Sequence, residues 1–213
     1  MAHERKRKLR DQISQKREPY LGYYHIVTDT EETEYNYLIG LNRSIPENLK
    51  DHLVIKVRTT ETKSLIDEVQ KAISYSAQYR EPWIVFDRDR IPDFDTIIAR
   101  AVKNNINVGW SNPCIETWFS AYFGKMSSNE DSKLCCKDFE RRYLKATKQA
   151  YQKSDKDIYK KLNQYGNEEN AIRIAKQRFI ALQKDGCCTP SQMCPATTLF
   201  FLVEEIKSKC RAK

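Results

Sequence analysis

Acidic residues stand where two apolar, β-branched segments of this chain end. The first segment, HIVTD, leads into an acid-rich stretch with Asp29 and Glu34, and the second, PWIVFDRD, ends in Asp87 and Asp89. Buried parallel strands of an α/β sheet present the residues after their carboxyl ends to a common crevice. Clustered carboxylates are ligands for a hard divalent cation such as Mg²⁺. The pattern therefore predicts a metal site suited to chemistry on phosphates.

Asp87 and Asp89 are two residues apart. If the strand pleat continues through them, both side chains leave the strand on the same face. We therefore expect them to hold one Mg²⁺ together, with Asp29 joining from the first strand and Mn²⁺ as an alternative ion.

A further acid, Glu116, follows the sequence Ser111-Asn112-Pro113. This sequence predicts a helix start, with Asn112 as the cap and Pro113 at the first helical position. Glu116 then falls in the first turn, where two roles are open. Its carboxylate either binds the metal or stabilises the positive end of the helix dipole.

Hydrophobic periodicity predicts a regular alternation of strands and helices. Strands are expected at 22–29, 53–59, 82–87 and 105–111, and helices at 31–42, 62–79 and 94–104. Such a β-α-β-α-β-α-β order is typical of an α/β fold with a parallel sheet.

The remainder of the chain is predicted to be helical and basic. After a polar loop at 125–134 we expect helices at 136–164 and 168–184, and a last helix opened by Pro195. Thr197 and Thr198 in its first turn are expected either to cap it or to meet a phosphate. An apolar stripe should pack this helix on the sheet domain; it comprises Leu199, Phe200, Leu202, Val203 and Ile206. The predicted parts are a basic arm at 1–18, a catalytic domain at 19–125 and a helical extension at 126–213.

The net charge of +8 is unevenly distributed. Residues 1–18 hold seven basic and three acidic side chains, residues 19–132 hold 12 and 17, and residues 133–184 hold 14 and six. Basic flanks around an acidic centre suit the binding of a polyanion such as nucleic acid, although solvated surface is the alternative. The residues predicted to contact nucleic acid are Arg5, Lys6, Arg7, Lys8, Arg88, Arg141 and Arg142.

Several classes of protein are disfavoured. The chain has no apolar run of membrane-spanning length, and its first segment is charged, so we expect a soluble cytoplasmic protein without a signal peptide. It also lacks a glycine-rich phosphate loop and a G-x-S-x-G turn, which argues against nucleotide hydrolysis of the Walker type and against a serine hydrolase. A receiver-type phosphoacceptor domain would place a lysine after the fourth strand, and none stands there.

The seven cysteines include the adjacent pairs Cys135-Cys136 and Cys187-Cys188 but no C-x-x-C spacing. Reduced thiols are therefore favoured over disulfides. A zinc site is the less favoured alternative, and its ligands would be Cys187, Cys188, Cys194 and Cys210.

Four segments, in order, resemble the RloB-like (AbiLii-type) family of Toprim-fold phage-defence proteins. The family elements are E-G-x-x-T-E-x-x-Y, D-x-D, S-N-P-x-F-E-x-W and a P-S-T-like turn. They correspond here to DTEETEYNY from Asp29, DRD from Asp87, SNPCIETW from Ser111 and CPATT from Cys194. The resemblance spans most of the chain.

The resemblance implies a Toprim-like domain that hydrolyses phosphodiester bonds with Mg²⁺. Its implied catalytic residues are Asp29, Glu34, Asp87 and Asp89, and its implied metal ligands are Asp29, Asp87, Asp89 and Glu116. The first-strand acid either binds the metal or relays a proton. Also implied are DNA or structured RNA such as tRNA as substrate, a role in abortive infection, and an AAA- or ABC-type ATPase partner.

The chain departs from the family at the first element, where Asp29 replaces a glutamate and Thr30 replaces a glycine. Three outcomes are open: the backbone comes closer, Glu31 or Glu34 supplies the acid, or the site is weakened. A weakened site would fit a different function, namely a catalytically impaired subunit that binds nucleic acid or a partner protein. The sequence leaves open DNA versus RNA, the cleavage context, the trigger and the oligomeric state.

Overall fold

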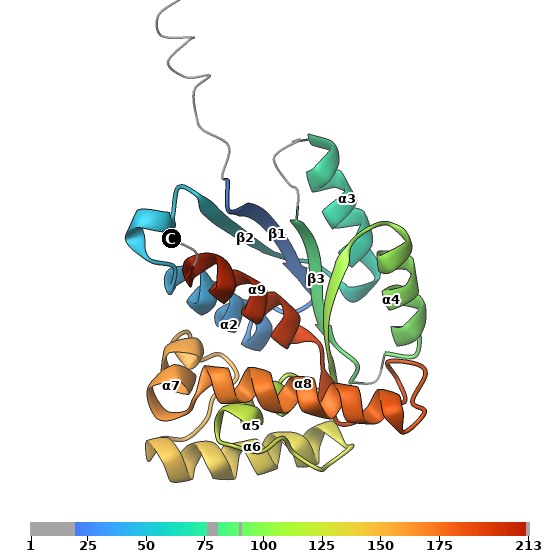
Figure 1. Cartoon of the computed structure of the whole chain (residues 1–213). Helices are drawn as coiled ribbons and strands as arrows, with labels where there is room; N and C mark the ends of the chain where they lie inside the picture. The colour runs from blue at the N-terminus through green and yellow to red at the C-terminus, as the bar shows by residue number, and fades with distance from the viewer. Residues whose placement is uncertain (1–19, 76–80, 90, 212–213) are drawn as a thin grey trace, which may run out of the picture.

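The computed structural model describes residues 20–75, 81–89 and 91–211, which build a five-stranded sheet with helices on both faces (Figure 1). The strands lie in the order β2 (Leu53–Thr59), β1 (Gly22–Thr28), β3 (Glu81–Asp87), β4 (Asn107–Asn112) and β5 (Ala196–Thr197). The first four run parallel to their neighbours, and β5 pairs antiparallel with β4. The predicted α/β class with a parallel sheet and C-terminal helices is thus confirmed, and the arrangement is consistent with a Toprim-like fold.

Strands β1 and β3 are direct neighbours in the sheet, although β2 and two helices lie between them in the sequence. Both are almost entirely buried, as the continuous apolar runs predict for central parallel strands. Their carboxyl ends lie at one edge of the sheet. The acids that follow the two strands are therefore brought to the same place.

Alternate side chains of the strands supply two apolar cores, one on each face. Ile84 and Phe86 pack on one side with α3 and α4, and Trp83 and Val85 pack on the other with α2 and α9 (Figure 1). The helices that cover the sheet are α2 (Thr33–Arg43), α3 (Leu65–Tyr75), α4 (Phe94–Lys103) and α9 (Leu199–Arg211), with short 3-10 turns at Glu47–Leu49 and Thr62–Ser64. All five residues of the apolar stripe predicted for the last helix are buried.

The remaining helices form a layer beside α2 and α9 (Figure 1). They are α5 (Glu116–Tyr122), α6 (Ser132–Thr147), α7 (Ile158–Tyr165) and α8 (Glu168–Lys184). Their buried side chains continue the core that packs under α2 and α9. The close approach of α2 to α7 requires Gly40, because a Cβ there would lie 2.3 Å from the Cβ of Tyr159.

The single helix predicted at 136–164 is wrong, because the chain forms α6 and α7 with a connecting segment at 148–157. Helix α6 begins early, at Ser132, where the side chain of Asp131 accepts a hydrogen bond from Leu134 N at 3.0 Å. It ends at Thr147, and the capping residue that follows, Lys148, has a left-handed backbone conformation. The connecting segment then places the ring of Tyr151 edge-on against Phe139. Packing of this ring, which the periodicity does not reveal, accounts for the break.

Two predicted helix starts are also wrong. Asn112 is the last residue of β4, and its amide donates to the carbonyls of Pro190 and Ser191 instead of capping α5. Pro195 precedes β5, and α9 begins four residues later, at Leu199. The hydroxyls of Thr197 and Thr198 donate to the β4 carbonyls of Trp110 and Val108, so they are not available to a phosphate.

Across the described ranges, no helix combines the length and the apolar character needed to cross a membrane.

Candidate metal centre

A cavity of about 670 Å³ opens at the carboxyl edge of β1 and β3. It is lined by the five acids predicted as catalytic residues or metal ligands, Asp29, Glu34, Asp87, Asp89 and Glu116. These residues come from the ends of two strands and the starts of two helices. The fold therefore gathers carboxylates that are up to 87 residues apart in the chain.

Asp29 follows β1 directly and has one oxygen satisfied and one free. The hydroxyl of Thr62 donates to Asp29 Oδ2 at 3.0 Å, whereas Oδ1 is buried without a protein partner. Burial and the negative charge of Glu34 raise the pKa of Asp29 to about 6.

Glu34 lies in the first turn of α2 and is almost fully buried. The hydroxyl of Thr30 donates to Glu34 Oε2, so this threonine orients the acid. Glu31, by contrast, is exposed, lies near the hydroxyl of Thr59 and lines a different pocket with Arg58. Of the two acids considered as substitutes for Asp29, only Glu34 faces the cavity.

Asp87 is the last residue of β3, and its two carboxylate oxygens have different surroundings. Oδ2 accepts a hydrogen bond from the backbone N–H of Ile115 at 2.9 Å, just before α5 begins. Oδ1 is buried without a protein partner. Burial, together with the negative charges of Glu34 and Glu116, raises the pKa of Asp87 well above its ordinary value.

Asp89 reaches the cavity by a different route from the predicted strand pleat. Strand β3 ends at Asp87, and Asp89 has a left-handed backbone with a φ of 33°. Its N–H donates to the carbonyl of Pro113, and its Oδ1 accepts from the hydroxyl of Ser132 at 2.9 Å. The expected same-face geometry is therefore wrong, although both side chains line the cavity.

Glu116 opens α5 and is 1% exposed. The hydroxyl of Tyr151 donates to its Oε1 at 3.0 Å, and the amine of Lys153 lies 3.9 Å from the same oxygen. Lys153 is the one basic side chain among the described residues that line the cavity. Sequence reasoning missed it, because nothing but general basicity distinguishes it within its segment.

The acids surround the cavity without converging on one point. Within the ranges that the structure describes, no three of these carboxylates have oxygens all within 4.8 Å of one another. Mg²⁺ usually keeps several of its waters and takes only one or two carboxylates directly. An oxygen-only set with two buried, unpaired oxygens, on Asp29 and Asp87, therefore fits a partly hydrated Mg²⁺.

Three of the basic residues predicted to contact nucleic acid belong to the described part of the chain, and none of them lines this cavity. Arg88 donates to the carbonyl of Ser191 at 2.8 Å, and Arg142 pairs with Asp138 at 2.9 Å. Arg141 also contacts Asp138 but is largely exposed. The four predicted contacts from Arg5 to Lys8 fall outside the described residues.

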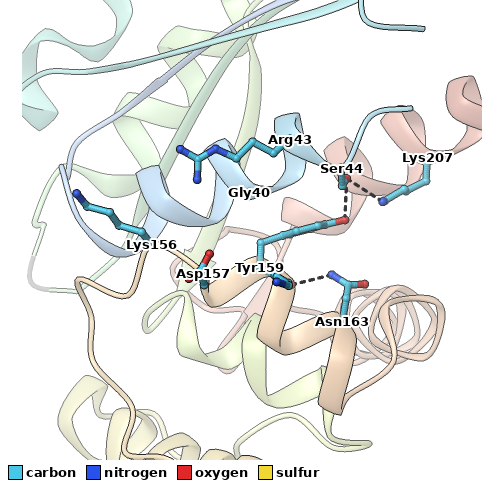
Figure 2. Close-up of a pocket in the computed structure, with 9 residues that line it drawn as sticks. Gly40, Arg43, Ser44, Lys156, Asp157, Tyr159, Asn163 and Lys207 are labelled. Atoms are coloured by element: carbon cyan, nitrogen blue, oxygen red, sulfur yellow. Dashed lines mark hydrogen bonds between the residues drawn. The ribbon is translucent and has the colours of Figure 1, made fainter. Parts of the chain in front are cut away.

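A second hollow, of about 430 Å³, lies between α2 and α7 (Figure 2). Four basic residues line it, and we call it the basic hollow: Arg43, Lys156, Lys160 and Lys207. Arg43 comes from α2, whereas Lys156 belongs to the segment before α7 (Figure 2). Lys207 is paired with Glu168 at 3.3 Å. No ion pair joins Arg43, Lys156 or Lys160 to another residue in the described part of the chain.

Comparison with known proteins gives one positive finding. A family model described as RloB-like protein matches residues 24–206, which include most of β1, all of β3 and all five acids. No curated protein and no solved structure matches the chain.

Replacing Asp87 by asparagine should stabilise the metal-free protein. A raised pKa means that the ionised carboxylate opposes folding above its ordinary pKa, and asparagine removes this charge while its oxygen can still accept the Ile115 N–H. We expect a gain of about 1–2 kcal/mol in the free energy of unfolding, or roughly 2–8 °C in melting temperature, at mildly alkaline pH with chelator. Mg²⁺ should stabilise the wild type but not Asp87→Asn.

Thermal unfolding with and without Mg²⁺ measures both effects. Asp89→Asn is the matched control, because this acid is exposed and should give a smaller gain in chelator. A lower melting temperature for Asp87→Asn, with an undiminished Mg²⁺ effect, would contradict this account of the cavity.

Proposed function

The chain belongs to the RloB-like family, and from this premise we propose that it is a Mg²⁺-dependent nuclease of the Toprim type. The proposed reaction is hydrolysis of phosphodiester bonds in DNA or in structured RNA such as tRNA. The observation that carries the proposal is the convergence of acids from the ends of β1 and β3 on one cavity, with buried unpaired oxygens on Asp29 and Asp87. Action in the cytoplasm as an effector of abortive infection, controlled by an AAA- or ABC-type ATPase, is proposed from the family resemblance alone.

Asp29, Glu34, Asp87 and Asp89 are the residues that would hold the ion. When bound, Mg²⁺ would polarise a phosphoryl oxygen and make an attacking water more acidic. The protein holds the acids ready for this: Thr62 fixes Asp29, Thr30 fixes Glu34, and the N–H of Ile115 fixes Asp87. Their orientation is therefore set before a substrate enters.

Lys153 would bind the substrate phosphate within the cavity. Its amine is held near Glu116, yet its side chain is 58% exposed and lines the cavity. A lysine ammonium is a compact donor for a phosphate oxygen. Lys153 would thus draw the anionic backbone into a cavity whose other charges repel it.

The basic hollow would bind the phosphate backbone of the nucleic acid at a distance from the scissile bond. Helix α2 carries Glu34 at its start and Arg43 at its end, about 14 Å along the helix axis. The segment 148–157 likewise carries Lys153 at the cavity and Lys156 at the basic hollow. Contacts of Lys and Arg with phosphates give affinity and register without reading the base sequence.

The proposed activity can be tested by cleavage of supercoiled plasmid, single-stranded DNA and total tRNA with Mg²⁺ or Mn²⁺. Wild-type protein should cut at least one of these substrates, and the Asp87→Ala/Asp89→Ala double variant should lose cutting by about a hundredfold or more while still binding nucleic acid. Glu31→Ala is the control, because this acid belongs to the same segment but lies outside the cavity.

Two outcomes would oppose the nuclease. Cutting retained by the double variant would show that the acids are not the catalytic residues. Tight binding of nucleic acid with no cutting by the wild type would favour the alternative, a catalytically impaired subunit, which the replacement of glutamate by Asp29 also suits.

Reversing charge in the basic hollow should weaken nucleic-acid binding. Arg43→Glu/Lys156→Glu is expected to lower affinity about tenfold or more at low salt and to reduce the salt dependence by about two ions. Arg100→Glu/Lys103→Glu is the matched control, because it changes the net charge equally on the opposite face of the sheet. Equal losses in the two variants, measured by fluorescence anisotropy, would show a non-specific effect of net charge.

A further inference from the structure

We infer that Cys114, Glu116 and Cys136 form a binding site for a thiophilic divalent cation of the Zn²⁺ type, in the wall of the same cavity. One ligand atom from each residue lies within 4.8 Å of the other two. In the part of the chain that the structure describes, no other group of three or more cysteine, histidine or acidic residues meets this criterion. The C-terminal cysteines, which the sequence left open as zinc ligands, do not form such a group.

The two sulfurs already have the spacing that a tetrahedral ion requires. Cys114 Sγ and Cys136 Sγ are 3.9 Å apart. Two sulfurs bound at about 2.3 Å to a tetrahedral Zn²⁺ are roughly 3.8 Å apart. The pair would therefore need little movement to bind one ion.

The ligands are held by separate elements of the fold. Cys114 and Glu116 flank Ile115, whose N–H is held by Asp87, and Cys136 lies in the second turn of α6. Cys114 and Glu116 are 5% and 1% exposed, so their side chains have little freedom. All three residues line the cavity, which leaves room for water as the fourth ligand.

The chemistry of this site differs from that of the neighbouring acids. Thiolates prefer soft or borderline ions such as Zn²⁺, whereas Mg²⁺ prefers oxygen. Binding displaces one proton from each thiol to the solvent. Two thiolates, one carboxylate and a divalent ion leave one negative charge. The ammonium of Lys153, 3.9 Å from Glu116 Oε1, offsets this charge.

The inference does not depend on nuclease activity, because metal binding by thiols is its readout. The full chain, reduced and kept without oxygen, is titrated with Co²⁺, whose thiolate charge-transfer and tetrahedral absorption bands report the ligands. We expect one equivalent of Co²⁺ with both bands, displacement by Zn²⁺, and no displacement by a large excess of Mg²⁺. Cys136→Ser should weaken Co²⁺ binding about tenfold or more. Mutation of residues that only hydrogen-bond to metal ligands already lowers metal affinity by about that factor.

Cys188→Ser is the control, because this cysteine is exposed and outside the group; it should behave as wild type. Glu116→Gln is a second variant that keeps both thiols, so it should keep the charge-transfer band while binding Co²⁺ more weakly. Absence of a thiolate band in the wild type would overturn the inference. So would unchanged binding by folded Cys136→Ser, loss of the band in Cys188→Ser, or displacement by Mg²⁺.

Discussion

The carboxylate of Asp87 connects the sheet to the rest of the cavity. Through one oxygen it holds the N–H of Ile115 and so joins the end of β3 to the start of α5. Its other oxygen is buried and has no hydrogen-bond partner, and the negative charges of Glu34 and Glu116 act on this carboxylate. Asp87 is thus held in place by the local structure while neighbouring carboxylates disfavour its ionised form. A bound cation would relieve this repulsion. Asp87 therefore fixes the position of the segment around Ile115, which carries Glu116 of the acid cluster and Cys114 of the thiol pair.

The strand order explains which parts of the site could be predicted. Continuous apolar runs predicted β1 and β3, and the pairing of these two strands in the structure brings the acids after them to one edge of the sheet. The route of Asp89 and the position of Lys153 could not be predicted in this way. Asp89 depends on a turn bonded to Pro113, and Lys153 depends on a segment anchored by Tyr151 against Phe139. Such contacts between distant residues leave no periodic signal in the sequence.

Two threonine hydroxyls hold the acids that follow β1. Thr30 supplies the hydroxyl that orients Glu34, and Thr62 supplies the one that holds Asp29. The shorter acid therefore stands beside a second acid fixed in the same cavity, whereas Glu31 points elsewhere. Glu116 adjoins the carboxylate of Asp87 and the thiols of Cys114 and Cys136. Oxygen and sulfur donors therefore line one cavity, together with the ammonium of Lys153.

The central claim is that the acids after β1 and β3 form one site for a divalent cation. Crystals grown with Mn²⁺ and measured for its anomalous scattering would test it most directly, because the signal places the ion without reference to activity. The account predicts an anomalous peak in the cavity, bound by Asp87 and by Asp29 or Glu34, directly or through ordered waters. A cavity without a peak at saturating Mn²⁺, or peaks only at acids elsewhere on the surface, would contradict it.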